Sequence, residues 1–189
     1  PEGPYRIAGW SAGGTIAYEI AHQLIGADQA VEFLGLIDTA GDYRALHELR
    51  TGAAPQPELE RDFDAWICSL DWLPLEHEPA LRPQLEALAS AGKVEALLAH
   101  AQRLGELPAE LDTAMLRRHL ALRHAMGDAL LSYVRPPLPI AFTLFSAIDE
   151  DRRQRPIGWA DGVAHRRIDV PGTHFSVVQP PHVRGVVNL

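Results

Sequence analysis

The chain has 189 residues, of which 47% are hydrophobic and 22% are charged, and its formal net charge at pH 7 is -8. This length suits a single domain, and the composition is that of a soluble globular protein. The sequence has no run of about 18 apolar residues and no stripe of basic residues, so we expect neither a membrane nor nucleic acid as a partner. A single cysteine cannot form an internal disulfide bond, which favours a cytoplasmic location.

The first part of the chain has the pattern of a strand, a helix and a second strand. Apolar runs at residues 5–10 and 31–37 predict strands that are buried on both faces, as in a parallel sheet. Residues 12–24 predict the helix between them. The apolar side of this helix is expected to contain Ile16, Ile20 and Leu24.

The character of the sequence changes between about residues 44 and 134, where prolines separate segments with helical periodicity. We expect a helical insertion here, and residues 113–133 form its clearest helix. The pattern of strands returns at 140–146, an aromatic and β-branched run, and at 165–170. Strands on both sides of a long helical block predict an α/β fold with a mostly parallel sheet and a helical cap.

Ser11 lies in the pattern G-W-S-A-G, between the first predicted strand and the first predicted helix. Chance would produce G-x-S-x-G in roughly 4% of chains with this composition, so its place between a strand and a helix adds weight. A sharp turn exposes the serine hydroxyl, and Gly9 and Gly13 are expected to remove side chains that would collide there. The main-chain N–H of Ala12 then lies at a helix N-terminus, where it can stabilise an oxyanion.

A serine nucleophile requires a base and an acid that orients the base. His174 is the candidate base, because it lies in a loop after the last predicted strand, as expected for the chain order serine, acid, histidine. Two acids compete: Asp38 ends the strand at 31–37, and Asp149 follows the strand at 140–146. Both positions are at the edge where parallel strands present ligand-binding groups, and spacing does not choose between them.

Four segments in this order resemble the thioesterase domain that ends nonribosomal peptide synthetases, with the thioesterase domains of polyketide synthases as near relatives. They are GWSAGGTIAYEIA, FLGLIDT, PLPIAFTLFSA and VPGTHFSVV, and the resemblance runs from about Gly3 to Val178. It implies an α/β-hydrolase fold in which the insertion at about 44–134 is a lid.

The resemblance also implies roles for the candidate residues. Ser11 would be the nucleophile, His174 the general base, Asp38 the acid with Asp149 as the alternative, and Ala12 one donor of the oxyanion hole. The substrate would be an acyl or peptidyl chain, held as a thioester on the phosphopantetheine arm of an upstream carrier protein domain. Release would occur by hydrolysis or macrocyclisation in the biosynthesis of secondary metabolites such as antibiotics. No metal and no directly bound cofactor are expected.

One departure from the family concerns the residues before Ser11. Family members have several strands there, and a loop that carries a second oxyanion donor. We therefore expect the chain to be part of a longer domain, with those strands and that donor outside it. The alternatives are a free-standing type II editing thioesterase, a small-molecule serine esterase and, less favoured because all three candidate residues are intact, a catalytically inactive hydrolase-fold binding module.

Overall fold

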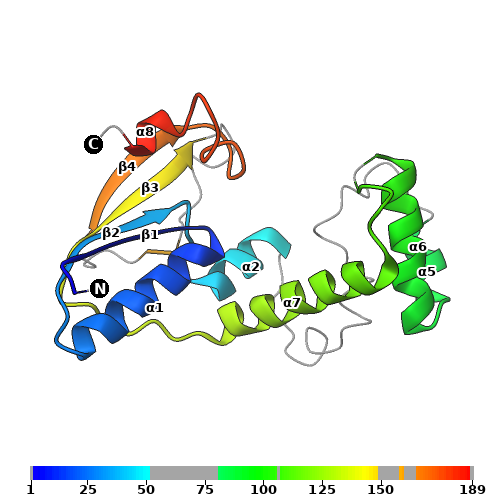
Figure 1. Cartoon of the computed structure of the whole chain (residues 1–189), viewed down its shortest axis with the longest axis horizontal. Coiled ribbons are helices and arrows are strands. Elements are labelled where there is room, and N and C mark those ends of the chain that lie inside the picture. The colour runs from blue at the N-terminus through cyan, green and yellow to red at the C-terminus, as the bar shows by residue number, and fades with distance from the viewer. Residues whose placement is uncertain (1, 52–80, 106, 149–157, 160–164, 188–189) are drawn as a thin grey trace. The chain divides into compact units, whose positions relative to one another are not determined.

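The computed structural model describes residues 2–51, 81–105, 107–148, 158–159 and 165–187. The chain divides into two compact units, one made of Pro1–Ala54 with Leu130–Leu189 and the other of Pro55–Ala129. The first unit contains a sheet with helices on its faces, and the second unit is helical where it is described (Figure 1).

In the described part of the first unit, the sheet has four parallel strands in the order in which they occur along the chain. They are β1 (Tyr5–Trp10), β2 (Val31–Ile37), β3 (Phe142–Ile148) and β4 (His165–Pro171). The first two strands have the predicted bounds. The third begins and ends two residues later than predicted, because Ile140 packs against the core without pairing in the sheet.

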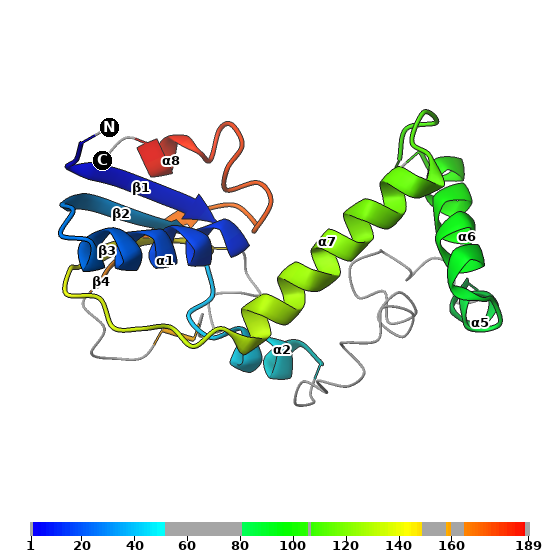
Figure 2. The same ribbon diagram turned by 60° about the horizontal axis from the view of Figure 1, so that its bottom comes forward.

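Helix α1 (Ala12–Gly26) covers one face of the sheet, and the short helix α8 (Arg184–Val187) lies on the opposite face (Figures 1 and 2). The predicted buried side of α1 is wrong, since Ile16 is 46% exposed and Ile20 is 44% exposed. Mostly small residues face the sheet instead and allow the helix to approach it closely. The buried residues of α1 are Gly14, Ala17, Tyr18 and Ala21.

Hydrophobic residues fill both faces of the sheet, because successive side chains of a strand point to opposite sides. On the α1 side, Leu34, Leu36 and Leu144 are buried together with residues of the helix. On the other side, Phe145 and Ala147 pack with Val170 and Val177. This two-sided burial explains why the strands read as continuous apolar runs in the sequence.

Every described element of the predicted insertion is helical, although residues 52–80 lie outside the described residues. Helix α2 (Tyr43–Thr51) follows β2 in the first unit. The second unit contains α5 (Leu81–Glu86), α6 (Ser90–Arg103) and most of α7 (Thr113–Ser132), whose residues after Ala129 belong to the first unit. The core of the second unit consists of Leu85, Val94, Leu97, Leu98, Leu116 and Leu120.

None of the helices in the described part of the chain is long and apolar enough to cross a membrane.

Candidate active site

Ser11 forms the turn between β1 and α1 in a strained backbone conformation. Its φ of 55° and ψ of -127° lie in a region that non-glycine residues rarely adopt. Its N–H donates a hydrogen bond of 2.9 Å to the carbonyl oxygen of Ile37, the last residue of β2. Although Ser11 occupies the cap position of α1, its hydroxyl makes no capping bond to the helix. The hydroxyl is therefore not committed to the helix that it precedes.

Of the two glycines predicted to avoid collisions in the turn at Ser11, Gly9 has this role and Gly13 does not. A Cβ atom on Gly9 would lie 2.0 Å from the carbonyl oxygen of Gly13, so this glycine is required by the turn. A Cβ atom on Gly13 would meet nothing within 4 Å among the described residues, so the predicted collision at Gly13 is wrong. The second required glycine is Gly14, whose Cβ would lie 1.9 Å from Oγ1 of Thr39. It permits close packing of α1 against the residue that follows Asp38.

Asp38 follows β2 directly and is almost completely buried, with 6% of its surface exposed. Its N–H donates to the carbonyl oxygen of Phe145, at 2.7 Å, and its φ of 44° turns the chain away from the sheet. Oδ1 accepts a hydrogen bond of 3.1 Å from the N–H of Ala147 on β3. Oδ2 lies 2.5 Å from Nδ1 of His174. Both carboxylate oxygens are thus held in fixed directions.

His174 lies in the turn that follows β4. Gly172, which has a φ of 113°, begins this turn, and the N–H of Val177 donates to the carbonyl oxygen of Thr173 at 3.0 Å. Thr173 and Ser176 bond to each other through side chain and main chain, with the Thr173 N–H 2.8 Å from Oγ of Ser176. The spacing T-H-F-S is therefore a local capping arrangement. The roles of Thr173 and Ser176 were not predicted, although this spacing is visible in the sequence.

The contact between Asp38 and His174 determines what the imidazole can do. The side chain of Asp38 is 2% exposed and that of His174 is 19% exposed. A carboxylate accepts the Nδ1 proton, which leaves Nε2 available to accept a proton from another group. The competing acid, Asp149, lies outside the described residues. The structure thus brings together the acid and the histidine that the resemblance implied, at the same edge of the sheet as Ser11.

A cavity of about 470 Å³ lies in the first unit, next to the first turn of α1. Its described lining includes Gly14, Thr39 and Trp159, but none of Ser11, Asp38 and His174. The guanidinium of Arg135 forms part of its wall; it lies 4.0 Å from the centre of the Trp159 ring and donates a hydrogen bond of 2.6 Å to the carbonyl oxygen of Gly41.

Tyr18 and Tyr133, which line the same cavity, both have raised pKa values. Burial is the main cause for both, and for Tyr133 the carboxylate of Glu19 raises the pKa further. The Tyr133 hydroxyl donates to Oε2 of Glu19 at 2.7 Å. The pKa of Glu19 is lowered, first by a hydrogen bond from Gln23 and then by that from Tyr133.

Within the described ranges, no group of three histidine, cysteine, aspartate or glutamate side chains is arranged to hold a metal ion.

The sequence matches the family model of the thioesterase domain over residues 1–188. The chain therefore belongs to the thioesterase domain family.

Its relatives include enzymes that build secondary metabolites. It is 28% identical to atromentin synthetase of Tapinella panuoides over 195 aligned residues, which cover 97% of this chain and 19% of that protein. It is 63% identical to the conidial pigment polyketide synthase PfmaE of Pestalotiopsis fici over 38 residues, or 20% of this chain and 2% of that protein. The chain thus spans a small part of the length of the curated relatives that it matches.

Solved structures have the same fold. A four-domain nonribosomal peptide synthetase bound to AMP and glycine matches with a TM-score of 0.72 and 27% identity, covering all of this chain and 14% of the other. The NocB thioesterase domain, in a covalent complex with a fluorophosphonate nocardicin G analogue, matches with a TM-score of 0.57 and 20% identity over 100% of this chain and 64% of that one. The mostly parallel sheet with its helices is the α/β-hydrolase fold of thioesterase domains.

Proposed function

We propose that this chain releases an acyl or peptidyl chain from the phosphopantetheine thioester of a carrier protein, with Ser11, His174 and Asp38 as the catalytic triad. The observation that carries the proposal is the 2.5 Å contact between Nδ1 of His174 and Oδ2 of Asp38. The strained turn at Ser11 supports it, because such a turn exposes a serine hydroxyl between a strand and a helix.

The reaction has two halves. Nε2 of His174 takes the proton of the Ser11 hydroxyl while the serine oxygen attacks the thioester carbonyl, and the main-chain N–H of Ala12 stabilises the oxyanion. The carbon–sulfur bond then breaks, and the leaving thiol takes the proton from His174, which yields an acyl-serine. In the second half, His174 removes a proton from water or from a hydroxyl or amine of the bound chain, and this nucleophile attacks the acyl-serine carbonyl. The ester bond to Ser11 then breaks, and the serine oxygen takes the proton back from His174, which releases the product by hydrolysis or cyclisation.

The carrier protein is proposed as the partner because the relatives are multidomain synthetases. The four-domain nonribosomal peptide synthetase has 27% sequence identity to this chain, and the fungal relatives are named as a synthetase and a polyketide synthase. We further propose that the helices between about residues 44 and 134 form the lid of one α/β-hydrolase domain, and that the protein acts in the cytoplasm. The phosphopantetheine arm belongs to the substrate in this proposal.

A serine-directed fluorophosphonate probe tests the assignment of the nucleophile. The intact protein should be labelled once, at Ser11, as identified by mass spectrometry of the labelled peptide. Ser11→Ala should abolish both the labelling and the hydrolysis of an acyl thioester of N-acetylcysteamine, which imitates the end of the phosphopantetheine arm. Labelling that survives Ser11→Ala would refute the assignment.

A further inference from the structure

Trp10 connects the serine turn directly to the histidine loop. It is the last residue of β1, so its main chain is continuous with Ser11, and it pairs with Ile37 in the sheet. Because the N–H of Ser11 also bonds to the carbonyl oxygen of Ile37, the sheet holds Trp10 and Ser11 as one rigid segment. Any group that the Trp10 side chain binds is therefore fixed in position relative to Ser11.

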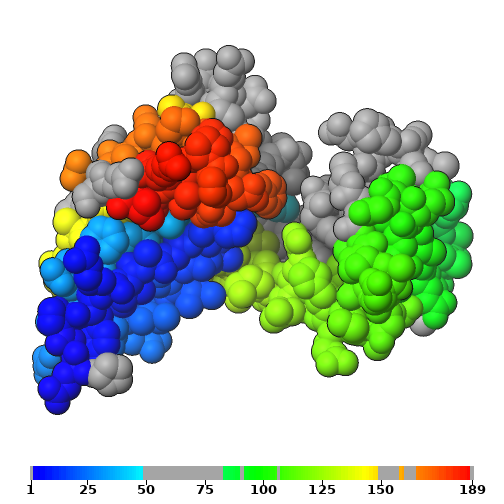
Figure 3. All heavy atoms as spheres, turned by 45° about the horizontal axis from the view of Figure 1, so that its top comes forward, coloured from blue at the N-terminus to red at the C-terminus, as the bar shows by residue number. Residues whose placement is uncertain are grey.

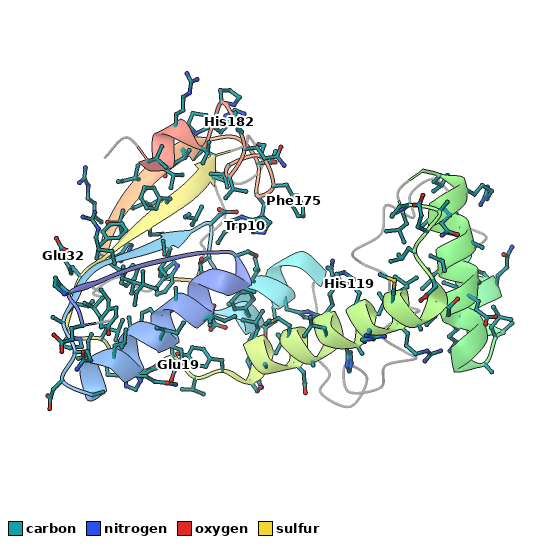
Figure 4. All side chains as sticks on the ribbon, in the orientation of Figure 1. Trp10, Glu19, Glu32, His119, Phe175 and His182 are labelled. Carbon is teal, nitrogen blue, oxygen red and sulfur yellow. The ribbon has the colours of Figure 1, made fainter. Side chains whose placement is uncertain are left out.

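The group that Trp10 binds is the main chain of His174. Its indole Nε1–H donates a hydrogen bond of 3.0 Å to the His174 carbonyl oxygen, across 164 positions of sequence. The indole and imidazole ring centres are 5.1 Å apart with 32° between the planes. Phe175 contacts both rings, and Figure 4 shows Trp10 and Phe175 close together at the carboxyl end of the sheet.

The loop that carries His174 is anchored by the packing of Val177 against Phe145 and, at His174 itself, by the bond from Trp10. It follows β4, an edge strand of the described sheet, and its own hydrogen bonds between Thr173 and Ser176 are local. Local bonds preserve the shape of a turn but do not position it relative to a distant strand. The Asp38 carboxylate holds the imidazole by Nδ1, whereas the Trp10 indole holds the main chain of the same residue. In Figure 3, the C-terminal residues, coloured orange to red, lie directly beside the blue N-terminal residues.

We infer that Trp10 is a positioning residue, whose indole N–H sets the place of His174 relative to Ser11. The inference rests on the proposed function, because it assigns Trp10 a part in aligning the proposed base with the proposed nucleophile. Two fixed points, one on the imidazole and one on the main chain, restrict rotation of the histidine about its contact with Asp38. Proton transfer from a serine hydroxyl depends on such alignment, since the donor and acceptor atoms must approach within hydrogen-bond distance.

The test removes the N–H and keeps an aromatic ring. In the intact protein, Trp10→Phe and replacement of the Trp10 indole by the isosteric benzothiophene should both slow fluorophosphonate labelling of Ser11 by about fivefold to tenfold, the effect of losing one partly buried hydrogen bond. The kcat for an acyl thioester of N-acetylcysteamine should fall by the same factor with an unchanged KM, because the indole acts on His174 and not on the substrate.

Tyr18→Phe is the matched control. It removes a side-chain hydrogen bond of 2.8 Å to the main-chain carbonyl of Pro136 in the same unit, but Tyr18 contacts neither the serine turn nor the histidine loop in any described bond. It should lower the unfolding midpoint and leave the labelling rate unchanged. Equal labelling rates for Trp10→Phe and wild type, an equal loss in Tyr18→Phe, or a raised KM with an unchanged kcat would overturn the inference. Absence of Ser11 labelling in the wild type would instead refute the proposed function itself.

Discussion

Oδ2 of Asp38 and Nδ1 of His174 lie 2.5 Å apart although 136 positions separate the two residues in the sequence. The side chain of Asp38 reaches His174 across the end of β3. The φ of 44° at Asp38 directs the chain away from β2, and Oδ1 accepts a hydrogen bond from the N–H of Ala147 on β3. One carboxylate thus binds both the neighbouring strand and the loop after β4. The acid is in this way oriented by the sheet itself.

Asp38→Asn should lower kcat by about 10⁴-fold with little change of fold. An amide has only one acceptor oxygen, so it cannot accept hydrogen bonds from Ala147 and His174 in the way that the carboxylate does. An amide nitrogen directed at Nδ1 would favour the wrong tautomer of the imidazole. Steady-state hydrolysis of an acyl thioester measures the effect, with circular dichroism to verify folding.

Asp149→Asn provides the comparison for this prediction. It should reduce kcat far less than Asp38→Asn, because Asp38 already occupies Nδ1 of His174. The opposite order would transfer the role of the acid to Asp149.

Gly14→Ala should destabilise the protein by about 1–3 kcal/mol, the usual cost of forcing an extra methyl group into a packed core. The new Cβ would lie 1.9 Å from Oγ1 of Thr39, so either the helix or the loop after Asp38 must move. Urea unfolding, followed by circular dichroism, measures the change in the free energy of unfolding.

Gly13→Ala is the control for Gly14→Ala. Among the described residues, nothing lies within 4 Å of a Cβ at this position, so we expect a change of less than about 0.5 kcal/mol, as at an open surface position. Equal destabilisation by the two substitutions would contradict the packing described here.

Arg135→Lys should destabilise the first unit by about 1–2 kcal/mol through loss of a charged hydrogen bond and a cation–π contact. The guanidinium stacks on Trp159 and donates to the carbonyl oxygen of Gly41, and an ammonium group cannot reproduce both interactions. Thermal unfolding measures the loss. Arg167→Lys serves as the control, because Arg167 pairs with Asp169 at an exposed site and the change there should be close to zero.

Burial of the Tyr133 hydroxyl, together with its hydrogen bond to Glu19, should make stability depend on pH in the alkaline range. The pKa of Tyr133 is raised above its ordinary value of 10.0, so folding favours the protonated hydroxyl. This contribution is complete below about pH 10, the pKa in the unfolded chain, and is lost as the pH rises toward the folded-state pKa. The difference in free energy of unfolding between wild type and Tyr133→Phe should therefore be constant from pH 7 to 9 and shift against the wild type above pH 10.

Urea titrations at pH 8 and pH 11 would measure this difference. Glu19 has the opposite effect on the pH dependence of stability, because its pKa is lowered from 4.5. Its contribution to the free energy of unfolding is present above that pH and is lost in acid. If the difference in free energy of unfolding between wild type and Tyr133→Phe does not change above pH 10, then folding does not raise the pKa of Tyr133.

The strands and the order of the candidate residues follow from patterns in the amino-acid sequence. β1 and β2 have the predicted bounds, because strands buried on both faces appear as uninterrupted apolar runs. The turn at Ser11 was recognisable from a local pattern of glycines, and Asp38 and His174 follow strands in the order that the resemblance implied. These features depend on neighbouring residues or on a shared sequence pattern.

Contacts between residues far apart in the sequence follow from the packing of the folded chain. Apolar spacing favoured Ile16 and Ile20 as the buried side of α1, but the close approach of the helix to the sheet buries glycine and alanine instead. The same approach requires Gly14, whose Cβ would meet Thr39, whereas a Cβ on Gly13 would meet none of the described residues. The bond from Trp10 to His174 joins residues whose proximity no local pattern encodes. Such contacts arise only when the chain folds, since they depend on how parallel strands bring their carboxyl ends to one edge.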